Sequence, residues 1–141
     1  MEYRKFGDSY VLRLDRGEEV LTALTDFCLR EQVALGSVEG LGASDHAVIG
    51  LYDVGKRQYH KESFDGPMEI TSLLGSISTK DGEPYLHLHI NLCRADMQVI
   101  GGHLNECRIS ATCELFVRTL AGRVERKLDE ETTGLNLYHF L

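Results

Sequence analysis

The sequence predicts an α+β fold in which a mainly antiparallel sheet carries one principal helix. The first observation is a segment whose apolar residues have helical spacing, and these are Val20, Leu21, Leu24, Phe27 and Cys28. The second is that most of the remaining chain consists of short segments with strand character, separated by glycine-containing turns. The third is the length of 141 residues, which suits one domain, so we expect residues 1–141 to share one core.

The first expected elements are a strand and the helix. Residues 9–14 form a short apolar segment typical of a strand. Asp15 and Glu18 are three residues apart, which is the spacing of a capping box, so the helix is expected to follow them and to run to about Gln32. One face of this helix is apolar, and we expect it to pack on the sheet.

Glycines and turn residues divide the middle of the chain. Gly40 and Gly42 lie two residues apart, which predicts a β-bulge or a tight corner between strands. Asp65, Gly66 and Pro67 predict a break in the strand pattern. The expected order is strand structure within 34–52 with a turn at 41–44, a hairpin turn at 53–56, a polar strand at 57–64, the break at 65–67 and a strand at 68–79.

The second half of the chain also has strand character. A turn at 80–84 leads into a strand that contains two histidines, and Gly101, Gly102 and His103 are expected to form a corner. The strongest β-propensity lies in 106–120. The expected order is the histidine strand, a turn at 94–96, a strand at 97–100, the corner, the strand at 106–120, a hairpin turn at 121–123, a strand at 124–128 and an apolar terminal segment at 135–141.

The histidine strand is the most informative stretch of the sequence. Apolar and polar residues alternate over 86–92, so His87 and His89 project from one face while the leucines and Ile90 project from the other. His103 follows fourteen positions after His89, behind two glycines that permit a sharp turn or a close approach of the backbone. Three imidazoles can bind zinc and leave a fourth position for water, which is an open site. The competing interpretation is that His87 and His89 are simply the exposed face of a strand.

Glu69 begins the strand that should pair with the histidine strand. It is therefore a candidate for the carboxylate that accepts the second ring N–H of a metal-bound imidazole, or for a general base. An exposed carboxylate at a strand end is the competing interpretation. We expect His46, His60 and His139 to be ordinary surface or half-buried histidines, and the cysteines not to be metal ligands.

Composition and charge exclude several classes of protein. The formal net charge of −7, with scattered basic residues, disfavours binding to nucleic acid. The four cysteines include no Cys-x-x-Cys pair, and the N-terminus has no apolar segment typical of a signal peptide, so we expect reduced thiols and a cytoplasmic location. No apolar segment is long enough to span a membrane.

Several motifs, in this order, resemble the PPC domain, the plant-and-prokaryote conserved domain. They are Gly40-Leu41-Gly42-Ala43, the segment 68–75, Leu86-His87-Leu88-His89 and Gly101-Gly102-His103-Leu104. The resemblance spans nearly the whole chain. It implies an antiparallel sheet curled toward a barrel, similar to acetolactate decarboxylase, and assembly into a homotrimer. It also implies zinc binding through His87, His89 and His103, because some stand-alone prokaryotic members bind zinc through the matching histidines.

The resemblance also carries a "predicted DNA-binding" label, which applies to many stand-alone members. In the plant proteins an AT-hook contacts DNA through Arg-Gly-Arg-Pro, and this sequence has no such tetrapeptide. Three hypotheses follow. The first is a cytoplasmic trimer with a three-histidine zinc site, the second is a DNA-binding regulatory module, and the third is a small metal-dependent lyase or hydrolase.

Overall fold

The computed structural model describes residues 1–140 and contains one helix among them. The predicted α+β class, with a mainly antiparallel sheet, is confirmed. No helix within the described residues has both the length and the apolar character that crossing a membrane requires. The elements are β1 (Glu2–Phe6), β2 (Ser9–Asp15), α1 (Val20–Glu31), β3 (Gly36–Asp53), β4 (Gln58–Lys80), β5 (Glu83–Arg94), β6 (Val99–Thr119), β7 (Glu125–Leu128) and β8 (Asn136–His139).

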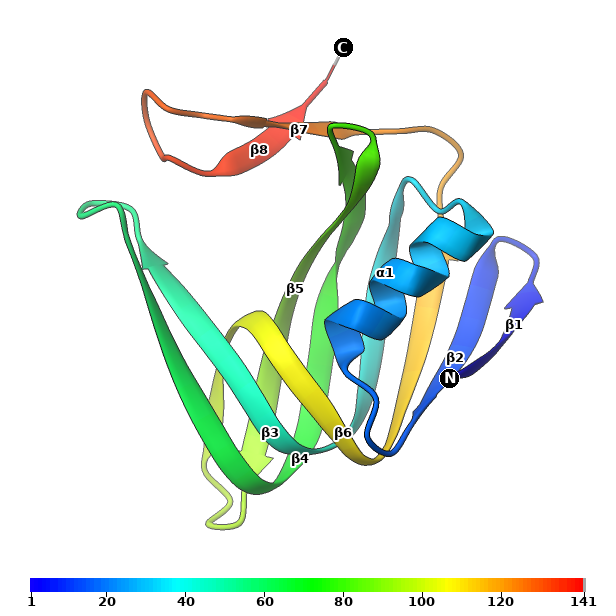
Figure 1. Cartoon of the computed structure of the whole chain (residues 1–141), viewed down its shortest axis with the longest axis vertical. Coiled ribbons are helices and arrows are strands. Elements are labelled where there is room, and N and C mark those ends of the chain that lie inside the picture. Colours follow the sequence, from blue (N-terminus) through cyan, green and yellow to red (C-terminus); the bar gives the residue numbers. More distant parts are fainter. Residues whose placement is uncertain (141) are drawn as a thin grey trace.

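Four strands form a closed ring. β3 pairs with β4, β4 with β5, β5 with β6, and β6 with β3, and all four pairings are antiparallel. β2 and then β1 extend the sheet beyond β6. Figure 1 shows the long, bent strands of this ring, with α1 lying against the half of the sheet that contains β2. The sheet is therefore curled and closed, although it is not a regular barrel.

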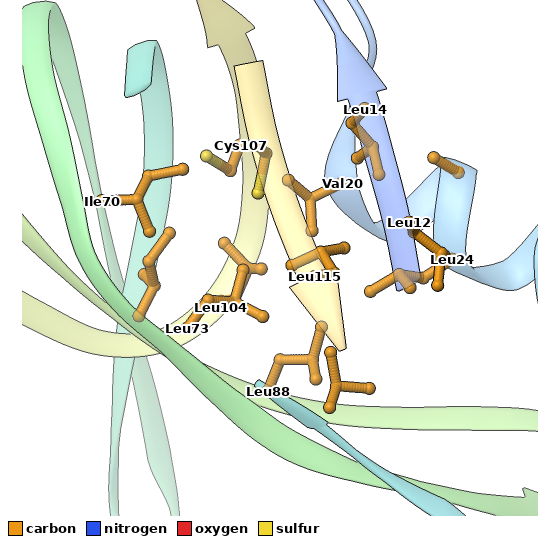
Figure 2. Packing of buried hydrophobic residues seen from close by; sticks show 14 of the residues in the cluster. Leu12, Leu14, Val20, Leu24, Ile70, Leu73, Leu88, Leu104, Cys107 and Leu115 are labelled. Carbon is orange, nitrogen blue, oxygen red and sulfur yellow. The ribbon is translucent and has the colours of Figure 1, made fainter. Parts of the chain in front are cut away.

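The core lies between α1 and the inner face of the sheet. Val20, Leu24 and Phe27 of the helix are fully buried, as the helical spacing predicts. Figure 2 shows Leu12 and Leu14 of β2 packed beside the helix, with Leu115 of β6 between Leu24 and Leu104. Burial of these side chains provides the main favourable contribution to folding.

The helix begins differently from the prediction. The N-cap is Glu19, whose carboxylate accepts hydrogen bonds from the backbone N–H groups of Leu21 (3.0 Å) and Thr22 (2.7 Å). Glu18 does accept from the backbone N–H of Asp15 (2.6 Å), but this bond closes the turn that precedes the helix. The capping-box assignment to Asp15 and Glu18 is therefore wrong, because the N-cap lies four residues beyond Asp15, and the free N–H groups of the first turn are satisfied by Glu19.

The structure has continuous strands at three positions where the sequence predicts an interruption. The turn at 41–44 lies within β3, the break at 65–67 lies within β4, and the corner at 101–103 lies within β6. The bulge predicted at Gly40 and Gly42 is confirmed by a shift of register between them. Glycine and proline bend these strands without ending them, because each long strand keeps its partners on both sides of the bend.

The ends of the chain also depart from the prediction. No strand was predicted at residues 2–6, but β1 lies there and pairs antiparallel with β2. The turn at 121–123 does not fold β7 back onto β6. Instead, β7 pairs antiparallel with β8 and makes a single parallel bridge from Glu125 to Thr79 of β4. The resulting β7–β8 hairpin crosses the end of the sheet at the top of Figure 1. Leu141, the last residue of the predicted apolar terminal segment, lies outside the described residues.

Candidate metal centre

The structure brings the three predicted histidines together. β5 supplies His87 and His89, and β6 supplies His103, which lies directly opposite His89 in the register of the two strands. The ring centroids are 5.2 Å apart for His87 and His89, 5.2 Å for His87 and His103, and 5.6 Å for His89 and His103. One nitrogen from each ring lies within 4.8 Å of the others. Three ligand atoms at this spacing can contact a single ion.

The alternation of β5 explains why the histidines face outward. Leu88, Ile90 and Leu92 are buried in the core with no more than 1% of their surface exposed. Successive side chains of a strand point to opposite faces, so the burial of the apolar residues directs His87 and His89 to the other face. The sequence pattern predicted this placement correctly.

The two glycines before His103 act through close approach and not through a turn. A Cβ atom on Gly102 would lie 2.7 Å from the carbonyl oxygen of Gly50 in β3, and one on Gly101 would overlap the side chain of Asn91 in β5. Only residues without a side chain allow β6 to pass this close to its neighbours. The glycine pair therefore fixes where β6 presents His103.

The histidines line a cavity of about 520 Å³ between the ring strands and the β7–β8 hairpin. Its walls are mainly aromatic and aliphatic. The described residues that line it include no aspartate or glutamate. Arg126 of β7 is the one lysine or arginine in this set. The lining residues are Gly50, Leu51, Tyr52, Tyr59, Tyr85, His87, His89, Gly101, Gly102, His103, Arg126, Leu135, Asn136 and Leu137.

The environment keeps at least two of the imidazoles neutral. Burial lowers the pKa of His103 to about 4, and the neighbouring His87 and His89 add to this effect. The pKa of His87 is also lowered, first by burial and then by the positive charge of Arg126 and by His89. A neutral imidazole has a free nitrogen lone pair, which is the form that binds a metal. Three imidazole nitrogens form a donor set suited to zinc.

Tyr59 and Asn105 surround His103 on the outer side. The ring of Tyr59 lies edge-on to the imidazole of His103, with centroids 6.1 Å apart. Asn105 Nδ2 donates hydrogen bonds to the Tyr59 hydroxyl (2.6 Å) and to the backbone carbonyl of His103 (3.1 Å). The sequence reading missed Tyr59 and Arg126, because no local pattern connects β4 or β7 with the histidine strand.

Glu69 does not reach the histidines, so its assignment as their hydrogen-bond partner or as a general base is corrected. Its side chain is exposed, it is not among the residues that line the cavity, and it lies opposite Cys93 in the register of β4 and β5. Leu74 occupies the position opposite His89, five residues along β4 from Glu69, or about 16 Å at the rise of a strand. The two strands do pair, as predicted, but in a register that places the carboxylate too far away.

The remaining histidines and the cysteines lie outside the cluster. His46 Nδ1 lies 2.7 Å from Asp65 Oδ1, and His60 and His139 are exposed. All four cysteines are free thiols, and burial raises the pKa of Cys107 to about 11 and that of Cys113 to about 12. Cys28, Cys107 and Cys113 belong to the core, Cys93 is half-buried, and no cysteine lines the cavity among the described residues.

Comparison with known proteins identifies a matching domain family. The model of the Plants and Prokaryotes Conserved (PCC) domain family matches residues 1–121. A search of curated proteins found no match.

Solved structures match over almost the entire chain. A "putative DNA binding protein" from Bacteroides thetaiotaomicron has a TM-score of 0.95 and 31% identity, covering 99% of this chain and 96% of its own. A metal-containing protein from Archaeoglobus fulgidus has a TM-score of 0.89 and 37% identity, with coverage of 99% and 97%. A plant- and prokaryote-conserved protein from Pyrococcus horikoshii has a TM-score of 0.86 and 31% identity, with coverage of 99% and 96%.

Proposed function

This chain belongs to the Plants and Prokaryotes Conserved domain family, the PPC domain that its sequence motifs resemble. We propose that it is a cytoplasmic, homotrimeric, zinc-binding member of this family. In this proposal residues 1–141 form one domain, and His87, His89 and His103 are the metal ligands. The observation that carries the proposal is the convergence of one nitrogen from each ring within 4.8 Å.

The chemistry of the donor set supports zinc. The proposed ligands are imidazole nitrogens, and the described residues that line the cavity include no carboxylate to favour magnesium or calcium. With three protein ligands the fourth position stays open, and zinc bound there would act as a Lewis acid and lower the pKa of a bound water. The Archaeoglobus relative, which is 37% identical, is named as a metal-containing protein.

Metal analysis of the purified protein tests the proposal. Protein prepared without chelator should contain about one zinc per chain, because three imidazoles and a water complete a tetrahedral site. His87→Ala and His103→Ala should lose the metal, whereas His60→Ala, which changes an exposed histidine outside the cluster, should retain it. A wild type that holds no metal and has no affinity for added zinc would contradict the proposal.

The homotrimer is supported by apolar side chains on the outer face of the sheet. Leu74 is 55% exposed and lies opposite His89 in the strand register, and Phe116, 53% exposed, lies opposite Val11. Leu74 and Phe116 both lie opposite Glu39 of β3 in the strand register, so they share one face, and exposed apolar groups on one face are typical of an interface. The family resemblance implies three copies.

The molar mass in solution tests the assembly. Light scattering should give three times the chain mass of 15.8 kDa for the wild type and a lower mass for Phe116→Asp. Leu29→Asp is the matched control, because Leu29 is 52% exposed but lies on α1. A monomeric wild type, or a trimer unaffected by Phe116→Asp, would count against this interface.

DNA binding is the second candidate, and the name of the Bacteroides relative favours it. The net charge of −7 opposes it, because non-specific affinity for DNA depends on neutralising phosphates with basic residues. We expect no band shift with duplex DNA at physiological salt. A shift that weakens steeply with added salt would establish the DNA-binding role instead.

A small metal-dependent lyase or hydrolase is the third candidate. The support is the open cavity of about 520 Å³ beside the three histidines, which has room for a small substrate. Turnover of a candidate substrate should then require the bound metal and disappear in His87→Ala. Turnover that survives both removal of the metal and this substitution would exclude the histidine site as its origin.

A further inference from the structure

Arg126 places a positive charge in a cavity whose described lining residues carry no negative charge. It makes no ion pair among the described residues, although the chain contains 22 acidic side chains. The neighbouring Arg123, by contrast, pairs with Glu125. A half-buried guanidinium without a carboxylate partner is costly unless an anion neutralises it.

The guanidinium of Arg126 is held firmly in place. Its Nε donates to Ser78 Oγ (2.8 Å), Nη1 to the backbone carbonyl of Asn136 (2.9 Å) and Nη2 to Ser76 Oγ (3.4 Å). The rings of Tyr138 and Tyr85 lie 4.3 Å and 4.7 Å from its Cζ atom. Among the described residues, one N–H on each terminal nitrogen therefore lacks an acceptor.

We propose that this cavity binds a small organic carboxylate, whose two carboxylate oxygens accept the remaining N–H groups of Arg126. The inference rests on the proposed function, because it assigns the rest of the ligand to the metal at the three histidines. Arg126 and the metal are both positive, and Arg126 lines the same cavity as the three histidines. An anion bound between Arg126 and the metal would neutralise both positive charges.

The walls of the cavity favour a carboxylate over a phosphate. A planar guanidinium with one free N–H on each terminal nitrogen matches the two oxygens of a carboxylate. A phosphate dianion is usually held by several cations or by a row of backbone N–H groups, whereas the described lining of this cavity offers one arginine among tyrosines and leucines. Tyr52, Tyr59 and Leu51 supply an apolar surface for the carbon atoms of the acid.

A purely structural role for Arg126 is the competing explanation. Its bonds to Ser78 and Asn136 also fasten β7 and β8 to the sheet. Arg123 fastens the same hairpin, since its Nε donates to Thr79 Oγ1 (3.0 Å), but it does not line the cavity. Arg123→Gln is therefore a matched control for loosening of the hairpin.

Calorimetric titration of the zinc-loaded protein with acid and amide pairs tests the inference. The probes are lactate against lactamide and mandelate against mandelamide, which differ in charge but little in shape. The wild type and Arg123→Gln should bind the acid of at least one pair about tenfold or more tightly than its amide. Arg126→Gln should remove that preference, and Arg126→Lys should restore part of it.

The possible outcomes separate the two proposals. If Arg126 only fastens the hairpin, Arg126→Gln should weaken the binding of acid and amide equally, and that result would overturn the inference. A zinc-loaded wild type with no preference for the acid in either pair would also overturn it, even if the variant fails to fold. Tighter binding of inorganic phosphate than of either acid would exclude the carboxylate class. A wild type that takes up no zinc would overturn the proposed function and this inference together, and metal analysis of the same sample identifies that case.

Discussion

The two faces of β5 have different functions, because alternate residues of the strand point to opposite sides. The inner face consists of Leu88, Ile90 and Leu92, which are sealed in the core. The outer face carries His87 and His89, which line a cavity. The inner face needs side chains that are apolar and of suitable volume, whereas the outer face must place two imidazole nitrogens beside a third from β6. Stability and metal binding should therefore respond to different substitutions, even between adjacent residues.

The largest effect on stability should come from the inner face. Ile90→Ala should lower the free energy of unfolding by about 2–5 kcal/mol, because it removes a side chain that is 1% exposed and leaves a cavity in the core. Urea denaturation of the metal-free protein measures this loss. At low urea, where the variant remains folded, its zinc content should equal that of the wild type.

The adjacent outer-face substitution is the matched control. His89→Ala should change the free energy of unfolding of the metal-free protein by less than about 0.5 kcal/mol, because His89 is exposed, yet it should lose zinc. If His89→Ala destabilised the metal-free protein as much as Ile90→Ala does, the proposed separation of the two faces would be wrong.

The next largest effect should come from Gly102, where the backbone packing of the ring strands meets the histidine site. Gly102→Ala should cost about 1–3 kcal/mol and weaken zinc binding, because a Cβ atom 2.7 Å from the Gly50 carbonyl forces β6 away from β3. Urea denaturation and metal analysis measure both effects. Gly55→Ala, where the nearest atom would be the Asp53 side chain at 3.4 Å, should change neither.

The same contrast explains what the sequence could and could not predict. Alternation places His87 and His89 on one face of a strand, so the cluster was accessible from the sequence together with the family's motifs. Arg126 reaches the cavity through the bridge from β7 to β4, and Tyr59 through the pairing of β3 with β6 beside His103, and no local pattern encodes these contacts between distant segments. Gly66, with φ +105°, reads as a strand break, but the pairing of β3 and β4 continues on both sides of it.

A smaller effect should appear in the pH dependence of the metal-free protein. His103 has a pKa of about 4 in the folded chain, against its ordinary value of 6.5, because it is partly buried beside His87 and His89. Between these values the unfolded chain binds the proton and the folded chain does not, so stability falls as the pH is lowered from about 6.5 to about 4. After allowance for solvent screening, we expect the free energy of unfolding to fall by about 1–2 kcal/mol over this pH range.

Urea denaturation across this pH range measures the effect. His103→Gln should show a shallower loss of stability between pH 6.5 and 4, because the group that binds the extra proton on unfolding is absent. His60→Ala, which changes an exposed histidine away from the cluster, should follow the wild type. An equal slope in the wild type and His103→Gln would mean that burial of His103 does not oppose its protonation.

The smallest effect should lie in the hairpin that covers the outer face. Asp129 accepts hydrogen bonds from the backbone N–H of Thr133 (2.9 Å) and from its hydroxyl (2.8 Å), and bonds from Thr132 and Thr133 lower the pKa of Asp129 to about 2. The carboxylate orders the loop between β7 and β8. Thr133 in turn accepts a hydrogen bond from the Tyr52 hydroxyl (2.9 Å) at the wall of the cavity.

Asp129→Ala should therefore speed amide exchange at Thr133 and leave exchange at Ile90 unchanged, because the loop opens locally while the core stays closed. Acid should have the same effect on the wild type. A carboxylate whose pKa is lowered by folding stabilises the loop above its ordinary value of 3.8, and this contribution is lost as the pH falls toward about 2. Glu130→Ala, one residue away and exposed, should leave exchange at Thr133 unchanged. If Asp129→Ala sped exchange at Ile90 as well, the hairpin would unfold together with the core and would not open as a separate cover over the histidines.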